Sequence, residues 1–197
     1  TLSDTTLAAS VLNTLDGHTS GTIDAGTVTT LTGAAADLNT AYDSSGITGL
    51  GDEAITLTDT SLAASVLNAL DGNTTGTVNA ATVTTLSGAA ADLNTAYDSA
   101  GITGLGNEAA TLSDTTLAAS VLNTLDGHTS GTIDAGTVTT LTGAAADLNT
   151  AYDSAGISNL GNEAVTLSDT TLAVSVLNTL DGNTTGTVNA ATVTTLT

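Results

Sequence analysis

Apolar side chains near the start of this chain recur at the spacing of an amphipathic helix. Leu7, Val11, Leu12 and Leu15 stand at positions i, i+4, i+5 and i+8, which places them along one side of a helix. This pattern predicts a helix from about Thr5 to Leu15 that buries a single apolar stripe.

Residues at both ends of this stripe are of the types that begin and end helices. Ser3 or Asp4 suits the N-cap position, and Gly17 stands where a left-handed C-cap residue belongs. A second helix is predicted from about Ala34 to Asp43, where three larger side chains are spaced by four, and Gly46 follows its end.

Between the two helices, short stretches rich in threonine alternate in a way that predicts strands. Val28, Thr30 and Thr32 would face one side of a sheet, and Thr29 and Leu31 the other. Strands are predicted within residues 21–25, 27–32, 46–50 and 53–58. Such short strands are not stable alone, so each needs a copy above and below it.

The whole pattern returns almost unchanged along the chain. The units are residues 1–55, 56–110, 111–165 and a partial fourth copy, 166–197. Each unit holds the pattern twice, because Leu12-Asn13-Thr14 recurs as Leu38-Asn39-Thr40 within the first unit. Periods of this size are typical of arrays in which each unit buries its apolar face against the next. We therefore expect one continuous repeat array over residues 1–197.

The predicted fold is an α/β repeat, a solenoid of about seven coils, two for each complete unit. Each coil would hold one helix and one or two short strands, with the strands stacked in parallel. Parallel strands stack about 4.8 Å apart, whereas neighbouring helices need about 8–10 Å, so a solenoid with all helices on one face would have to curve. Successive helices on opposite faces of a central sheet would allow a straight array, although uniform right-handed crossovers argue against it.

A third level of repetition has twice the period of the unit. His18 and His128 occur in the first and third units, where the second and fourth units have Asn73 and Asn183. Tandem duplication explains this period, and the alternative is that alternating units meet different neighbours. We interpret the two histidines as exposed turn residues, because no pattern of acid and nucleophile surrounds them.

The charge of the chain limits its partners. It contains 20 Asp and Glu but no Lys or Arg, a formal net charge of −20, so no conventional salt bridge can form. A basic nucleic-acid-binding face is excluded, attraction to an anionic membrane is disfavoured, and no stretch is apolar and long enough for membrane insertion. Repulsion among the acids must be relieved by salt, by bound cations or by a basic partner.

An aspartate follows the last apolar residue of each predicted helix. A helix C-terminus carries unpaired carbonyl oxygens, which together with a carboxylate and nearby hydroxyls suit Ca²⁺. We hypothesise weak calcium sites at these turns, with no other cofactor; the alternative is that the aspartates are solvated turn residues. The candidates are Asp16, Asp43, Asp71, Asp98, Asp126, Asp153 and Asp181, and Asp24 and the pair Asp52 and Glu53 are secondary candidates.

Stacked strands would align the abundant threonines in ranks. If Thr30 and Thr32 point outward, such ranks could order water and bind ice. We favour the interpretation that threonine fills the space between coils, with its hydroxyls bonded to neighbouring backbone.

No pattern points to catalysis. The chain has no cysteine and no Gly-x-Ser-x-Gly, and the glycine-rich stretch Gly46–Gly51 lacks the lysine of a phosphate-binding loop. Paired carboxylates could act in acid–base chemistry, but each full unit offers only one tyrosine as an aromatic platform for a sugar. We expect no enzymatic activity.

Three stretches, Gly21–Ala25, Val28–Tyr42 and Gly46–Ala54, carry a resemblance. With their copies, which cover the whole chain, they resemble tandem repeats in very large surface or secreted proteins of marine cyanobacteria and other aquatic bacteria. This resemblance implies extracellular display in calcium-rich surroundings. The Gly-Gly-x-Gly-x-Asp calcium motif of related toxin-type repeats is missing, so no metal ligands transfer.

These observations predict a structural protein of the cell surface or extracellular space that forms, or belongs to, a filament or sheath. Open sheet edges template further pairing, so we expect the chain to be its own partner in an end-to-end homopolymer. Leu2 and Leu7 would meet Val193 and Leu196 of the next copy. The alternative is a spacer in a giant, calcium-stiffened adhesin.

Overall fold

A computed structural model describes all residues, 1–197, as seven helices alternating with eighteen short strands. The helices are α1 (Ala9–Gly17), α2 (Ala35–Asp43), α3 (Ala64–Asn73), α4 (Ala90–Asp98), α5 (Ala119–His128), α6 (Ala145–Asp153) and α7 (Val174–Asn183). The strands are β1 (Thr6–Ala8), β2 (Ile23–Asp24), β3 (Thr30–Gly33), β4 (Ile47–Thr48), β5 (Ala54–Leu57), β6 (Ser61–Ala63), β7 (Val78–Asn79), β8 (Thr85–Gly88), β9 (Ile102–Thr103), β10 (Ala109–Leu112), β11 (Thr116–Ala118), β12 (Ile133–Asp134), β13 (Thr140–Gly143), β14 (Ile157–Ser158), β15 (Ala164–Leu167), β16 (Thr171–Leu172), β17 (Val188–Asn189) and β18 (Thr195–Leu196). The predicted α/β repeat solenoid of seven helix-bearing coils is confirmed.

Two kinds of coil alternate along the chain. We call the coils that contain α1, α3, α5 and α7 A coils; their helices share the sequence Ser-Val-Leu-Asn. The coils that contain α2, α4 and α6 are B coils, and their helices all read Ala-Ala-Asp-Leu-Asn-Thr-Ala-Tyr-Asp.

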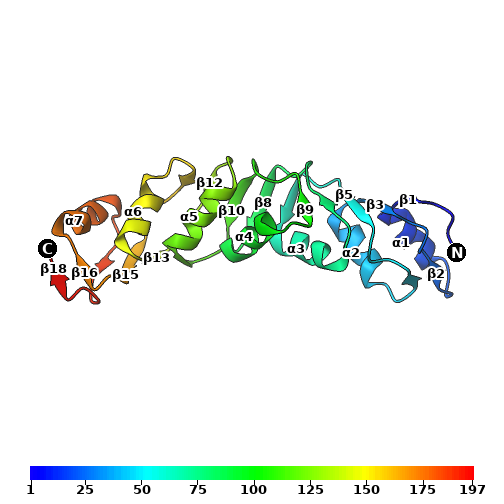
Figure 1. Ribbon diagram of the computed structural model, residues 1–197, viewed down its shortest axis with the longest axis horizontal. Coiled ribbons are helices and arrows are strands. Elements are labelled where there is room, and N and C mark those ends of the chain that lie inside the picture. The colour runs from blue at the N-terminus through cyan, green and yellow to red at the C-terminus, as the bar shows by residue number, and fades with distance from the viewer. The chain divides into compact units, whose positions relative to one another are not determined.

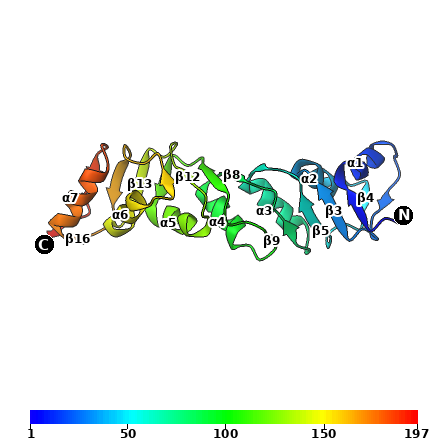
Figure 2. The same cartoon turned by 90° about the horizontal axis from the view of Figure 1, so that it is seen from above.

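The coils form two compact units, Thr1–Leu86 with Thr95–Leu105, and Ser87–Asn94 with Gly106–Thr197. In the first unit α1 contacts α2 and α2 contacts α3 (Figure 1). In the second unit α5 contacts α6 and α6 contacts α7 (Figure 2). Because successive helices touch within each unit, the alternative with helices on opposite faces of a central sheet is wrong there.

Parallel strand ladders connect successive coils, and they follow a shorter period than the sequence repeat. In the first unit the ladder order is β1-β3-β5-β7-β9. Thr6 pairs with Thr30 and Thr30 with Ala54, so two ladder steps lead from Thr6 to Ala54. The copy of Thr6 in the next repeat, Ser61, lies seven residues beyond Ala54 and starts a separate strand, β6. A new ladder therefore begins in each repeat.

The second unit repeats this register. Thr116 pairs with Thr140 and Thr140 with Ala164 in the ladder β11-β13-β15-β17. The same shift in sequence joins Ile133 to Ile157 in β12 and β14.

Aliphatic side chains from helices and strands fill the core between them. The fully buried leucines and isoleucine of the first two repeats include Leu12, Leu31, Leu38, Ile55, Leu67 and Leu86. Small residues allow close packing, since a Cβ on Gly33, whose φ is +149°, would stand only 3.7 Å from the Cβ of Ala9. Phenylalanine, tryptophan and methionine are absent from the chain, so this core relies on branched aliphatic residues and alanine.

The predicted start of the first helix is wrong. Thr6–Ala8 is a strand, and the helix begins at Ala9 with Ala8 at the N-cap and no side-chain cap, so neither Ser3 nor Asp4 caps it. Gly17 is the last helical residue and does not adopt a left-handed conformation. Pairing of β1 with β3 recruits residues that the helical stripe alone assigns to the first turn.

The predicted alternation in the strand after the first helix is also wrong at Val28. Val28 precedes β3, and both Val28 and Leu31 are buried, whereas Thr30 and Thr32 are half-buried. The second helix, in contrast, runs from Ala35 to Asp43, within one residue of its predicted bounds.

Candidate functional site: the interface between coils

Threonine and serine hydroxyls join each coil to the one before it. Thr29 Oγ1 donates to the carbonyl oxygen of Thr5 at 3.1 Å, and in the second unit Thr139 Oγ1 donates to that of Thr115 at 3.0 Å. The same kind of bond recurs with donors Thr48, Thr82, Thr84, Thr137, Thr192 and Thr194. The interpretation that threonine hydroxyls bind neighbouring backbone is confirmed, and each bond satisfies a carbonyl that the coil–coil contact would otherwise desolvate.

An aspartate from each A coil caps the helix of the preceding B coil. Asp59 Oδ2 accepts the backbone N–H of Ala35, the first residue of α2, at 2.8 Å. Asp114 accepts from Ala90, and Asp169 from Ala145, also at 2.8 Å. A carboxylate at a helix N-terminus satisfies an unpaired donor and complements the helix dipole.

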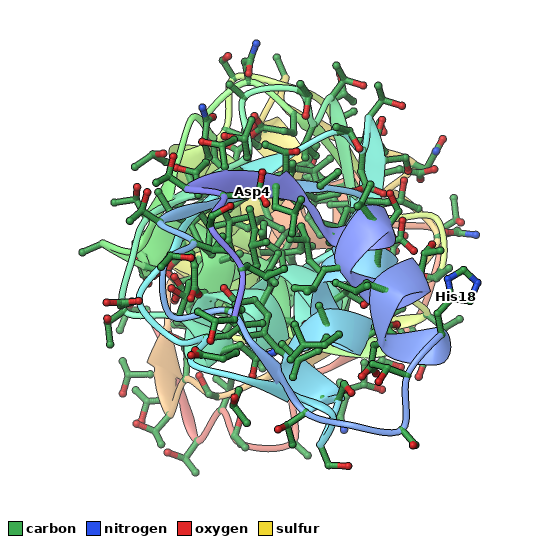
Figure 3. The ribbon with its side chains drawn as sticks, turned by 90° about the vertical axis from the view of Figure 1, so that its right-hand side faces the viewer. Asp4 and His18 are labelled. Atoms are coloured by element: carbon green, nitrogen blue, oxygen red, sulfur yellow. The ribbon has the colours of Figure 1, made fainter.

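Asp4 is the copy of this capping aspartate in the first coil. Its side chain is exposed, and Figure 3 shows it on the segment that leads into the first A helix. A sequence window around Asp4 could not reveal the role of its copies, because the helix that Asp59 caps begins at Ala35, in the preceding coil.

A second aspartate of each A coil bonds to the following B coil. Asp16 Oδ2 accepts the hydroxyl of Ser44 at 2.6 Å, and Gly46 lies so close to Asp16 that a Cβ there would collide with Oδ1. The same arrangement joins Asp71 to Ser99 and Gly101, and Asp126 to Ser154 and Gly156. Gly46 therefore allows close approach of a carboxylate and is not a left-handed helix end.

Each complete repeat buries one glutamate entirely. Glu53 accepts the hydroxyl of Tyr42 at 2.9 Å and the backbone N–H of Gly51 at 2.9 Å on Oε2. Glu163 accepts from Tyr152 at 3.1 Å and from Gly161 at 2.8 Å. No Lys or Arg exists to balance these carboxylates, so the hydroxyl and the loop N–H groups solvate them. From sequence, Glu53 was predicted only as a secondary calcium candidate.

The tyrosine beside each of these glutamates is harder to ionise than a free tyrosine. Burial is the main cause that raises the pKa of Tyr42, and the hydrogen bond to Glu53 and its charge add to it. Burial and the Glu163 charge raise the pKa of Tyr152 to about 12, although a hydrogen bond with Thr184 opposes the shift. The tyrosines therefore act as neutral donors to the glutamates at ordinary pH.

A line of asparagines between adjacent helices is a feature that was not predicted from sequence. Asn13 Nδ2 donates to the carbonyl oxygen of Asp37 at 2.9 Å, and Asn73 Nδ2 donates to Asn39 Oδ1 at 3.1 Å. In the second unit Asn123 bonds to Asp147 and Asn183 to Asn149 in the same way. The signal was present as the Leu-Asn pair in every helix.

The structure distributes the seven predicted calcium aspartates over two environments. Asp16, Asp71 and Asp126 are half-buried and accept serine hydroxyls, as described above, whereas Asp43, Asp98, Asp153 and Asp181 are exposed. No three acidic or histidine side chains converge as a metal-binding group. Binding through one carboxylate and backbone carbonyls stays a prediction.

The secondary calcium candidates also differ in environment. Asp24 accepts the hydroxyl of Thr1 and the N–H of Gly26, and it is exposed. Asp52 is exposed, whereas its neighbour Glu53 has no exposed surface. The two side chains therefore do not form one solvent-facing pair.

The two histidines differ in exposure. His18 is exposed in the turn after α1, as predicted, and Figure 3 shows its ring projecting outward. His128 is the last residue of α5 and is half-buried, so its interpretation as an exposed turn residue is wrong. It stands where Asn183 of the fourth unit reaches the preceding helix.

Apolar side chains that other coils bury are exposed in the first and last coils. Leu15 is 40% exposed, whereas its copies Leu70, Leu125 and Leu180 have no exposed surface. Leu196 is 54% exposed, and its copies Leu31, Leu86 and Leu141 have none. Among the predicted assembly residues Leu2, Leu7 and Val193 are half-buried, and Leu196 is exposed. Prediction from sequence missed the exposed Val11, Leu15 and Val174.

The interface between coils is the repeated structural feature of this molecule, which has no surface pocket. Its helices have nine or ten residues, about half the length that a bilayer requires, and none can span a membrane. Comparison with family models, curated proteins and solved structures finds no match for this chain. The fold places it among α/β repeat solenoids.

Proposed function

We propose that this chain is a non-enzymatic structural protein, an acidic solenoid that forms or belongs to an extracellular filament or sheath. The observation that carries this proposal is the recurrence of one set of coil–coil bonds along the chain. A hydroxyl bond, an aspartate cap and an aspartate–serine bond return in successive repeats. The function follows from stacking, since such arrays gain stability from each neighbouring coil.

The exposed side chains of the first and last coils support stacking as the mode of assembly. Leu15 and Leu196 differ from their buried copies only in lacking one neighbouring coil. Covering a leucine side chain contributes about 1.5–3 kcal/mol, so a further coil of the same repeat is the partner these faces fit.

The extracellular location and the role of calcium rest on composition and on the resemblance described above. A chain with a net charge of −20 repels itself and its copies at low ionic strength. Salt or divalent cations at the exposed aspartates would relieve this repulsion, and extracellular surroundings supply both.

Electron microscopy of two chains tests this proposal. The first is the chain of residues 1–197, and the second adds a copy of residues 33–55 after Thr197 to complete the fourth repeat. The ends of the second chain then reproduce the internal junction between Ile55 and Thr56. We expect filaments of the completed chain, more readily with millimolar calcium; isolated particles of both chains at all concentrations and salts would reject filament formation.

A spacer in a large adhesin is the second candidate function. It is favoured by the observation that interior coils find hydrogen-bond partners within their own chain, as Asp59 and Ala35 do. A spacer would stay monomeric in the experiment above. Light scattering across a hundredfold range of protein concentration separates the two functions.

A further inference from the structure

We infer that the exposed faces of A coils bind B coils and exclude A coils, so that alternation of the two coil types is a recognition rule. This inference rests on the proposed function, because it names the partner of the same stacking faces. It predicts that the occupant of each exposed face is a coil with the sequence of residues 33–55 or its copies.

The face of an A coil toward the following coil selects its partner through Asp16. In the B coil Ser44 supplies a hydroxyl to this carboxylate, and Gly46 leaves room for it. Alignment of the two coil types at their shared Leu-Asn-Thr places Ser20 of an A coil at the position of Gly46 in a B coil. A Cβ at that position collides with Asp16 Oδ1, so an A coil cannot approach as closely.

The same contrast holds at the other A-to-B junctions. Gly101 faces Asp71 and Gly156 faces Asp126 with the same lack of space for a Cβ. The aligned residues of the A coils, Ser20, Thr75, Ser130 and Thr185, all carry a Cβ. Glycine at this position therefore marks every B coil that follows an A coil.

The opposite face of an A coil selects its partner through the capping aspartate. Asp59 requires a free N–H at the start of the preceding helix, and Ala35 of the B coil provides it. In an A coil this N–H already has a partner, since Val174 N donates to Thr197 O at 3.0 Å. An A coil in place of the B coil would leave the carboxylate without this donor, which is costly at a desolvated interface.

The first and last coils of this chain are both A coils. The first exposes Asp4, Val11 and Leu15, and the last exposes Val174 and Asp181. Direct contact between the first coil of one copy and the last coil of another would thus place an A coil on an A coil. The occupant that satisfies each face is a B coil.

Thiol labelling of the full chain tests this rule on the first coil. The chain has no cysteine, so Leu15→Cys introduces a single reporter at a site that is already exposed. One extended chain adds a copy of residues 30–55 before Thr1, which supplies a B coil, and a matched chain adds residues 4–29, an A-type segment of equal length. Val11→Cys is a second reporter, and Thr40→Cys is a reference, because Thr40 and its copies Thr95 and Thr150 are all exposed.

We expect the B extension to slow labelling of Leu15→Cys and Val11→Cys about tenfold or more, because the thiol then reacts only after local opening. The A extension should leave both rates near those of the unextended chain, and Thr40→Cys should be unaffected throughout. Equal protection by both extensions, or protection by neither, would overturn the rule. Slower labelling of the unextended chain at high protein concentration would also overturn it, since a second copy would then cover the face with an A coil. All these results are independent of whether filaments form.

Discussion

Asp59 and Ala35 belong to different coils, yet the carboxylate of one caps the helix that begins at the other. Asp59 Oδ2 accepts the Ala35 N–H at 2.8 Å, and the N-cap residue of that helix, Ala34, makes no side-chain bond of its own. The start of α2 is therefore completed by the next coil, which couples helix formation to stacking.

Removal of this cap is expected to weaken the coil that receives it. Asp59→Ala should lower the free energy of unfolding by about 1 kcal/mol, the usual effect of losing an N-cap side chain. Urea unfolding measures the loss, and hydrogen exchange should place it at the first amides of α2.

Asp4→Ala is the matched control for this substitution. Asp4 occupies the same repeat position, but it is exposed and caps no helix of this chain. Its replacement should change stability by less than about 0.5 kcal/mol. Equal losses from Asp4→Ala and Asp59→Ala would show that the bond across the coils contributes nothing.

The sequence predicts the repeat, the fold class and the second helix because these depend on local periodicity. It does not predict β1, because Leu7 fits the apolar stripe of a helix as well as it fits a strand paired with Leu31. Ladder pairing between successive coils decides between them, and the aspartate caps follow the same register. A local window contains none of these partners.

The buried glutamates show a second limit of prediction from sequence. Glutamate is ordinarily among the least buried residues, so Glu53 was interpreted as a surface candidate for calcium. Its burial depends on the Tyr42 hydroxyl, which comes from the end of the preceding helix, and on the N–H of Gly51. Only the packed coil reveals that these donors converge.

Gly46 should tolerate no side chain while Asp16 is present. Gly46→Ala places a Cβ against Asp16 Oδ1, and overpacking of this kind costs about 1–3 kcal/mol. The double variant Asp16→Ala with Gly46→Ala should lose less than the sum of the single changes, because the colliding group is gone. Additive losses in urea unfolding would contradict the proposed collision.

Gly17→Ala is the control for that experiment. Gly17 is helical, and a Cβ at this position would have no heavy atom within 4 Å. Alanine is the better helix former, so this change should raise stability by up to about 1 kcal/mol.

Alkaline pH should destabilise the chain through its tyrosines. The pKa of Tyr152 is raised from 10.0 to about 12 in the folded chain. A raised folded-state pKa contributes stability that is complete below pH 10 and is lost as the pH rises toward 12. A variant with Tyr42→Phe and Tyr97→Phe isolates Tyr152, whose phenolate absorbance should appear near pH 12 when folded and near pH 10 in urea. Identical titrations in both states would contradict the buried pairing with Glu163.

Salt and calcium should both stabilise this chain, by different mechanisms. With 20 acids and no Lys or Arg, the folded array repels itself, so sodium chloride should raise the melting temperature by screening. Calcium at matched ionic strength should raise it further if helix ends such as Asp43 and Asp153 bind the ion, since a ligand specific for the folded state stabilises by mass action. Asp43→Asn with Asp153→Asn should reduce this additional rise while the sodium effect persists. A melting temperature that depends on ionic strength alone, with no difference between calcium and sodium, would leave these aspartates as solvated turn residues.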